Sequence, residues 1–279
     1  MIVAGALFAL MGVFVKLGAH YFSSAELVFY RSLIGLLVIY AIVRQQHLSL
    51  ATAHVRMHVW RGLSGFFALM MFFYAIGALP LATAITLNYT SPLFLALFMT
   101  LALKQRPQWR LLGAIALGFT GVTLLLNPAF HGQDLAAGLL GLCSGVLAGI
   151  AYLNIRQLGR AGEPEWRIVF YFTLVCTLGA GLWMLVHPFH ALSWHNAPIL
   201  LGLGTTATLA QLAMTRAYRL GNTLVVGSLA YSTVVFASLF GIVIWGEVLA
   251  PAAWGAIALI VASGIISTYA TSKRKTGVA

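Results

Sequence analysis

The second half of this chain repeats short segments of the first half in the same order. Residues 28–30, Val-Phe-Tyr, recur 141 positions later (169 − 28 = 141) at 169–171. Residues 113–117, Gly-Ala-Ile-Ala-Leu, recur 142 positions later (255 − 113 = 142) at 255–259. An offset that drifts by one residue over this distance is not chance similarity between apolar runs. The chain is therefore expected to contain two copies of one structural unit.

Composition places both copies in a lipid bilayer. The chain is 61% hydrophobic and 8% charged, whereas a soluble domain carries about 25% charged residues. A helix needs about 20 apolar residues to cross the hydrocarbon, and no strand-like alternation competes with this interpretation. The sequence predicts an all-α integral membrane protein with ten transmembrane helices, at 1–19, 24–43, 58–78, 81–103, 110–127, 136–155, 168–187, 197–216, 222–245 and 251–271.

Each copy holds an odd number of these predicted helices. Residues 1–135 contain the first five, and residues 136–279 contain the last five with a short basic tail. The second copy must therefore cross the membrane in the opposite sense, as an inverted repeat with a pseudo-twofold axis in the membrane plane. Inverted repeats place a binding site between the copies and allow alternating access. A central cavity between the two units is the expected site.

The basic residues predict the orientation of the chain. Of its sixteen Lys and Arg residues, all but Lys16 and Arg31 fall on one side of a ten-span topology. The other side holds Asp134 and Glu247, with Glu26 near it. Basic loops stay in the cytoplasm, so both termini are expected there, in a bacterial inner membrane. The basic loops are short and separate, which disfavours nucleic acid as the partner of this +11 chain.

The ends of the two copies carry a family resemblance. The second copy ends with Trp-Gly-Glu-Val-Leu at 245–249, followed by Gly255-Ala256 and Gly264. With the helix number and the repeat, this pattern makes the whole chain resemble the drug/metabolite transporter superfamily, in its ten-helix branch with two EamA-type repeats. The first copy departs from the pattern, because Lys104-Gln105 stands where Gly-Glu is usual, so a matched carboxylate pair is absent.

Within that branch the chain looks most like bacterial exporters of aromatic and other amino acids. The resemblance implies a membrane transporter that exports small neutral metabolites. Sister groups carry nucleotide sugars, riboflavin or drugs on the same scaffold. An exporter of drugs, of riboflavin-like or of nucleotide-linked metabolites, with or without proton coupling, is therefore the alternative.

A polar run in the fourth predicted helix is the clearest candidate for a substrate site. Pro92 lacks an N–H, and its ring clashes with the carbonyl of Asn88, so a kink or opening is expected there. Irregular backbone inside a membrane is tolerated where it lines a cavity or is covered by protein. A packing kink is the alternative interpretation. The candidate substrate-binding residues of this run are Thr86, Asn88, Tyr89, Thr90 and Pro92.

The repeat extends these candidates to the ninth predicted helix. At an offset of 142, Thr86 corresponds to Ser228 and Tyr89 corresponds to Tyr231. The two tyrosines are expected to face one another across the central cavity. Ser228 and Tyr231 therefore join the candidate substrate-binding residues.

Two further helices carry polar or aromatic faces. Gly204, Thr208, Gln211 and Thr215 lie at i, i+4, i+7 and i+11, on one face of the eighth helix. An amide is costly against lipid, so Gln211 is expected to face the cavity or to bond another helix. The third helix has an aromatic face, which suits an apolar substrate group or simple packing: Trp60, Ser64, Phe67, Met71 and Tyr74. Thr208, Gln211 and Tyr74 are the candidates from these faces.

Three charged residues are candidates for gating or coupling. Arg31 is deep in the second helix and needs a protein partner, whereas Glu26 and Glu247 sit near the ends of spans. The alternative for the two glutamates is an interfacial anchor. His187, His190 and His195 share one predicted loop without a nearby carboxylate or Cys, so neither a metal nor another cofactor is expected.

The middle of every predicted span lacks Asp, Glu and His. Proton-coupled carriers generally use such a residue as the proton relay, so facilitated export is favoured. An uncharged cavity of aromatics, hydroxyls and amides suits neutral amino acids, and phosphate-bearing substrates are disfavoured because only Arg31 and Lys16 are available. No nucleophile–base constellation or metal cluster indicates an enzyme. One chain carries both halves, so a monomer without an obligate protein partner is sufficient.

Overall fold

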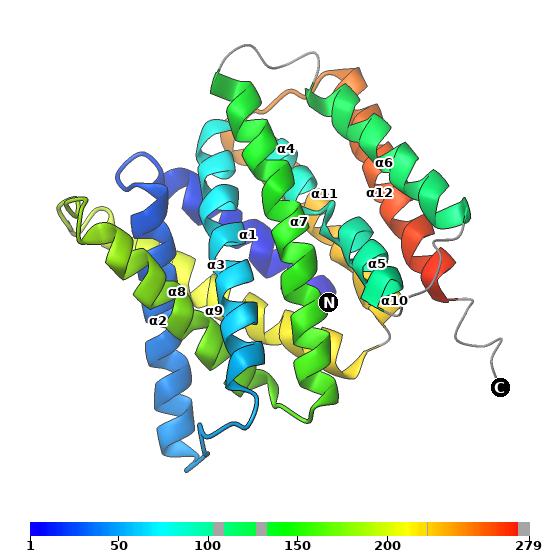
Figure 1. Ribbon diagram of the computed structural model, residues 1–279. Coiled ribbons are helices and arrows are strands. Elements are labelled where there is room, and N and C mark those ends of the chain that lie inside the picture. The colour runs from blue at the N-terminus through cyan, green and yellow to red at the C-terminus, as the bar shows by residue number, and fades with distance from the viewer. Residues whose placement is uncertain (103–108, 127–132, 222, 273–279) are drawn as a thin grey trace.

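The computed structural model describes residues 1–102, 109–126, 133–221 and 223–272, and every regular element in these ranges is a helix. Each predicted span matches one helix or a pair of short ones (Figure 1). The helices are α1 Ile2–Gly18, α2 Ser24–Gln45, α3 Val55–Ala78, α4 Leu81–Asn88, α5 Ser91–Ala102, α6 Trp109–Leu126, α7 Gln133–Arg160, α8 Glu165–Met184, α9 Ala197–Leu220, α10 Thr223–Ala230, α11 Ser232–Trp245 and α12 Pro251–Ser272.

The fourth and ninth spans are each broken in the middle. The first break falls at Tyr89 and Thr90, between α4 and α5, and the second falls at Tyr231, between α10 and α11. Pro92 occupies the second position of α5, where a missing N–H costs nothing, so the break lies just before it. The Thr90 hydroxyl donates to the Leu87 carbonyl at 2.7 Å and satisfies one freed acceptor. The second break has no proline and follows the first through the repeat.

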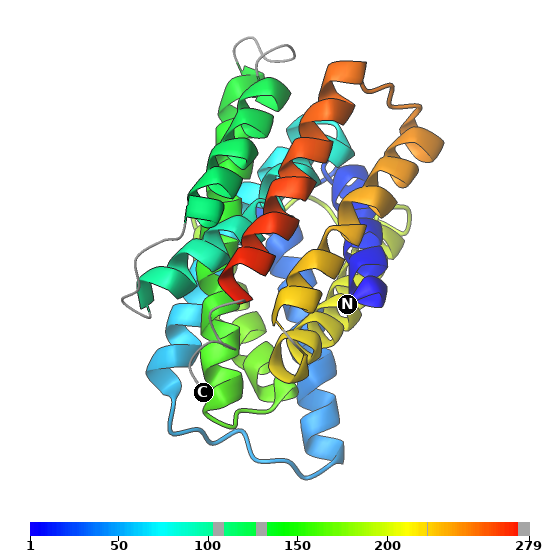
Figure 2. The same cartoon turned by 90° about the vertical axis from the view of Figure 1, so that its right-hand side faces the viewer.

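The packing follows the symmetry of the repeat. Two helices contact their own counterparts, in the pairs α2 with α8 and α6 with α12, and the two broken spans contact each other through α4 and α11. Other contacts come in related pairs, since α1 with α9 matches α3 with α7, and α2 with α9 matches α3 with α8. Both views show α6 and α12 side by side at the edge of the bundle (Figures 1 and 2). The fold is that of two inverted five-helix repeats around a centre.

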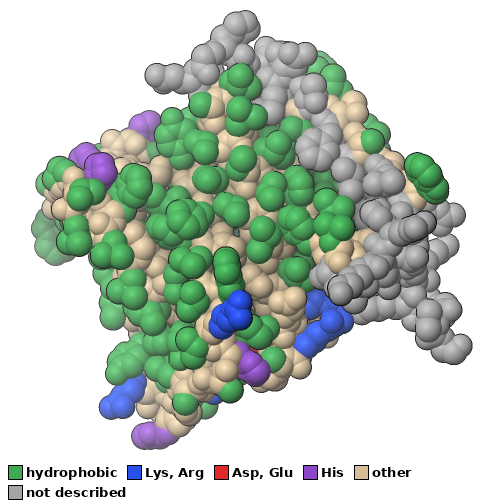
Figure 3. All heavy atoms as spheres, in the orientation of Figure 1, with side chains coloured by type: hydrophobic (Ala, Val, Ile, Leu, Met, Phe, Trp, Pro, Cys, Tyr) green, Lys and Arg blue, Asp and Glu red, His purple; other side chains and the backbone are tan. Residues whose placement is uncertain are grey.

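The outside of the bundle is apolar. Six helical segments within the described ranges are long and apolar enough to cross a membrane, and three further apolar helices are shorter. On the face in Figure 3, hydrophobic side chains cover the sides of the bundle, and Lys and Arg gather toward its lower end. Such a surface is stable against lipid rather than water. The chain is a multi-pass membrane protein.

A central cavity with two buried arginines

A cavity lies between the two copies at the level of the first helix break. Asn88 and Tyr89 line it at the break, and Gln211 lines it from α9. The space open to the centre of a water molecule is about 60 Å³, several times what one buried water needs. The other lining residues are Phe8, Met11, Arg31, Arg61, Gly65, Ala68, Leu69, Phe72, Ile85, Ala148, Ala151, Tyr152, Phe172, Met214 and Thr233.

Arg31 reaches this cavity from α2. Its side chain is buried, with 3% of the residue exposed. One guanidinium nitrogen, Nη2, donates to Gln211 Oε1 at the long distance of 3.5 Å. Gln211 in turn donates through Nε2 to the Thr215 hydroxyl at 3.4 Å. The Nε and Nη1 atoms of Arg31 are buried without a hydrogen-bond partner.

Arg61 reaches the same cavity from α3. The residue is 2% exposed, and its Nε and Nη1 atoms also lack partners. Its guanidinium carbon lies 4.0 Å from the ring centre of Phe172, and that of Arg31 lies 5.4 Å from the same ring. Gly65, one turn along α3, makes room for it, since a Cβ there would collide with Arg61 Nη1 and approach Phe172 to 2.7 Å. Both cations therefore lie against one aromatic ring.

The acidic residues that the structure describes are engaged elsewhere. Glu26 contacts His190, Glu163 contacts Arg167, Glu165 contacts Arg219, and Glu247 contacts Lys16. The chain has five acids, and the side chain of the fifth, Asp134, lies outside the described residues. Neither cavity arginine forms an ion pair with a described residue. The cavity is thus cationic, and the expectation of an uncharged cavity is wrong.

Arg61 was missed because it looks like one of the basic residues at a cytoplasmic helix end. The structure begins α3 at Val55, which places Arg61 in the second helical turn. The signal lay in the residues around it, because Arg61, Gly65, Ala68 and Phe72 recur at i, i+4, i+7 and i+11 and all line the cavity. The aromatic face proposed instead points outward, with Trp60 58%, Phe67 51% and Tyr74 45% exposed.

The candidates of the fourth span divide into two groups. Asn88 and Tyr89 line the cavity, and Asn88 Nδ2 donates to the Ser144 hydroxyl at 2.8 Å. Thr86 and Thr90 are buried but donate to carbonyls of their own segment, those of Ala82 and Leu87, both at 2.7 Å. Pro92 is the second residue of α5, beside the break, and is not among the lining residues.

The candidates of the second copy are placed differently from their counterparts. Tyr231 lines a separate cavity between α11 and α12, and its hydroxyl packs where a Cβ of Gly264 would be. The two tyrosines therefore do not face one another across the central cavity. Thr233 lines that cavity from α11 instead. Thr208 is buried and donates to the Gly204 carbonyl at 2.7 Å, and the side chain of Ser228 lies outside the described residues.

At one end of the bundle, Glu247 ties α11 to the start of α4. Gly246 ends α11 in the left-handed conformation, with φ of 61°, which glycine adopts at little cost. Glu247 then accepts from the Leu81 backbone N–H at 3.0 Å and forms an ion pair with Lys16. Lys16 also donates to the Leu79 carbonyl at 3.2 Å. These contacts close this end between α1, α4 and α11.

Glu26 belongs to the same end and does not contact Arg31 through any described bond. It forms a capping box with Ser23 at the start of α2. It also accepts from the His190 backbone N–H at 2.6 Å, and His190 Nδ1 lies 2.7 Å from its other oxygen. Among the described residues no group of three or more His, Cys, Asp or Glu is placed to hold a metal ion.

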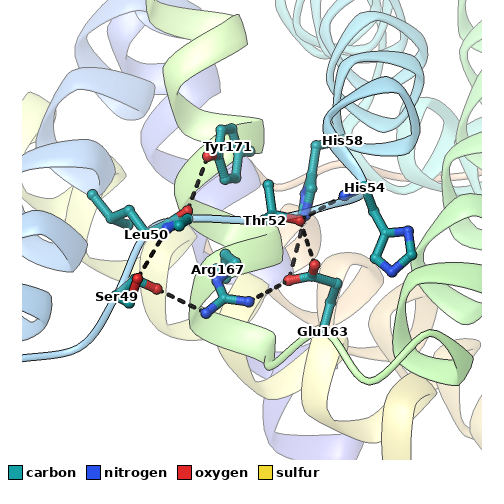
Figure 4. Close-up of polar contacts among 9 residues, drawn as sticks. Ser49, Leu50, Thr52, His54, His58, Glu163, Arg167 and Tyr171 are labelled. Atoms are coloured by element: carbon teal, nitrogen blue, oxygen red, sulfur yellow. Dashed lines mark hydrogen bonds and ion pairs between the residues drawn. The ribbon is translucent and has the colours of Figure 1, made fainter.

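At the opposite end, the α2–α3 loop is tied to the start of α8 (Figure 4). Arg167 donates to Glu163 Oε2 at 2.9 Å and to the Ser49 carbonyl at 2.7 Å, and Tyr171 donates to the Leu50 carbonyl at 3.0 Å. Thr52 donates to Glu163 as well. Burial alone would raise the pKa of the Glu163 carboxyl. The hydrogen bonds from Thr52 and Arg167 lower it by more, so the pKa lies below its usual value.

Comparison with known proteins agrees with this architecture. The EamA-like transporter family matches residues 1–127 and again 135–269. The chain is 33% identical to the pseudopaline exporter CntI of Pseudomonas aeruginosa, over 99% of this chain and 95% of that protein. It is 23% identical to a riboflavin transporter of Brucella anthropi, over 87% of each chain. A solved crystal structure with 19% identity shares the fold at a TM-score of 0.68, over 98% of this chain and 97% of that one. The chain belongs to the EamA-like transporter family.

Proposed function

We propose that this protein exports small amino-acid-like metabolites that carry a carboxylate, by alternating access. The observation that carries the proposal is the cavity between the two copies, which combines cations, an amide pair and apolar walls beside a broken helix. Substrate sites of repeat-built carriers lie at such breaks, near mid-membrane. The proposed substrate is still built like an amino acid, but it is anionic rather than neutral, because Arg31 and Arg61 favour an anionic group.

The lining of the cavity supports a facilitative mechanism. Among the described lining residues none is Asp, Glu or His, so the cavity offers no ordinary proton relay. An inside-negative membrane potential pushes an anion outward by about 2.3 kcal/mol per charge at 100 mV. Export of an anionic metabolite therefore needs no proton. The name of the Pseudomonas relative supports the outward direction.

The charge distribution supports the orientation. We propose that the end of the bundle with Arg156, Arg167 and Arg219 faces the cytoplasm, together with both termini, because basic loops are retained there. The end that Lys16 and Glu247 close then faces outward. We also propose that residues 1–135 and 136–279 act as the two moving halves and that one chain is sufficient, because the cavity is built from both copies of a single chain.

The test is flux of labelled amino acids in proteoliposomes that contain the purified protein, with and without gradients of pH and potential. We expect saturable flux that ignores the pH gradient, and that responds to potential when the substrate is anionic. Asn88→Ala is expected to reduce the flux because Asn88 lines the cavity. The matched control is Thr205→Ala, an exposed hydroxyl that bonds its own helix. Flux that requires the pH gradient would reject the facilitative mechanism, and absence of flux for every amino acid would reject the substrate class.

A further inference from the structure

We infer that the central cavity binds a small dicarboxylate, with one carboxylate on Arg31 and the other on Arg61. This inference rests on the proposed transport function and narrows its substrate class. A neutral amino acid offers one carboxylate, which leaves one of the two cations unpaired. Two separate buried guanidiniums indicate a ligand with two anionic groups.

Both arginines are buried and have nitrogens without a hydrogen-bond partner. Arg31 and Arg61 are 3% and 2% exposed, and each has two buried nitrogens without a hydrogen-bond partner. An unpaired buried charge is costly, and an intramembrane cation normally pairs with an acid. Four of the five acids pair elsewhere in the structure, and the side chain of Asp134 is not described. The structure therefore leaves these nitrogens to a ligand.

The two guanidinium groups lie close to one another. Both guanidiniums lie against the ring of Phe172, so they are within the length of one small molecule. A guanidinium presents its donors as a planar fork that matches a carboxylate in two parallel hydrogen bonds. Gln211 holds Arg31 through Oε1, and Gly65 leaves the space that the Arg61 side chain occupies. Each arginine is thus held in place with part of its fork free.

Apolar side chains form part of the cavity lining, and we expect the middle of the ligand to lie against them. Phe72, Met11 and Met214 line the cavity together with Phe172, and Asn88, Tyr89, Tyr152 and Thr233 add polar groups to the same lining. A short hydrocarbon linker fits the apolar side chains better than a strongly hydrated one. Glutarate, two carboxylates joined by three methylenes, is the simplest probe with this pattern, and its monoamide differs by a single charge.

The test measures thermal stabilisation of the purified protein by glutarate, by glutarate monoamide and by inorganic phosphate, and their inhibition of flux in proteoliposomes. We expect glutarate to bind about 10- to 100-fold more tightly than the monoamide, because the monoamide leaves a charged donor unpaired. In Arg31→Gln and in Arg61→Gln this preference should disappear. Arg216→Gln, at an exposed position on α9, is the matched control and should keep it.

The outcomes separate the inference from the proposed function. Equal binding of glutarate and its monoamide, with flux of amino acids intact, overturns the dicarboxylate inference and leaves the transporter proposal standing. Tighter binding of phosphate than of glutarate overturns it in favour of a single compact anion. Absence of flux for every carboxylate overturns both. If either glutamine variant fails to fold, Arg31→Lys and Arg61→Lys keep the charge but lose the fork, and each should still lower the preference for glutarate.

Discussion

Within the part of the chain that the structure describes, charged side chains form pairs at the two ends of the bundle, whereas in its centre they are unpaired. At the ends, Glu163, Glu165 and Glu247 each pair with an arginine or a lysine, as in the Lys16–Glu247 and Arg167–Glu163 pairs, and Glu26 contacts His190. In the centre, Arg31 and Arg61 have no acid at all among the described residues. Pairs at the ends tie loops and helix starts together. Unpaired cations in the centre of a membrane protein do not serve stability, so they indicate binding.

The largest effect is expected from placing an acidic side chain in the centre. Gln211→Glu would place a carboxylate at the oxygen that Arg31 already contacts at 3.5 Å. The internal pair should compete with the substrate, and carboxylate flux should fall about 100-fold, the scale of one charged hydrogen-bond pair. The measurement is flux in proteoliposomes, with exposed Gln157→Glu as the matched control. Unchanged flux in Gln211→Glu would show that Arg31 does not hold the substrate.

Removing a cation from the centre should stabilise the protein, whereas removing one at an end should destabilise it. Arg61→Met removes an unpaired buried charge, so the ligand-free protein should gain about 1–3 kcal/mol of stability. Arg219→Met leaves Glu165 without its partner, and since that pair is partly exposed the loss should be about 0–1 kcal/mol. Thermal unfolding of both variants checks this contrast. Destabilisation by Arg61→Met would mean that this arginine has a structural role.

A smaller effect is expected from crowding one cation without changing any charge. Gly65→Ala brings a methyl group against Arg61 Nη1 and Phe172. Displacing the guanidinium from its fork geometry should weaken carboxylate binding severalfold, up to about tenfold. Gly77→Ala in the same helix is the control, because its Cβ would meet only Ala19, at 3.3 Å. Equal affinities of the two variants would contradict the placement of Arg61.

The smallest effect is expected for the pH dependence of stability at the end of the bundle where the α2–α3 loop meets the start of α8. The pKa of Glu163 is held below its usual value, so its pairing stabilises the protein fully at neutral pH. That contribution should begin to fade as the pH falls below about 4.5 and should vanish below the lowered pKa. Melting curves from pH 7 down to about pH 2 cover that range, and Glu163→Gln should flatten that acid limb. An unchanged acid limb in the variant would assign it to other groups.

Much of the fold follows from the sequence because it depends on length, hydrophobicity and repetition. The ten spans could be predicted because a helix must be long enough to cross lipid. The break before Pro92 follows from its missing N–H, while the break at Tyr231 follows only from the repeat.

Side-chain direction was harder to predict. In a bilayer both the lipid face and the cavity face of a helix are apolar, so the hydrophobic pattern does not fix its rotation. For this reason the sequence favours the aromatic face of α3 that holds the exposed Tyr74 over the buried face that holds Arg61. The contact between Glu26 and His190 joins residues 164 positions apart, which no local pattern indicates.

The most direct test of a cationic central site is the charge that moves with the substrate. Proteoliposomes on a solid-supported membrane would be exposed to a jump in glutarate concentration, and the resulting current would be recorded. We predict a saturable current carried by negative charge, which Gln211→Glu should lower about 100-fold. We also predict a steady-state distribution that shifts roughly 50-fold per 100 mV for each charge transported. Equal responses to glutarate and to neutral glutamine, with no net charge moved, would contradict the account.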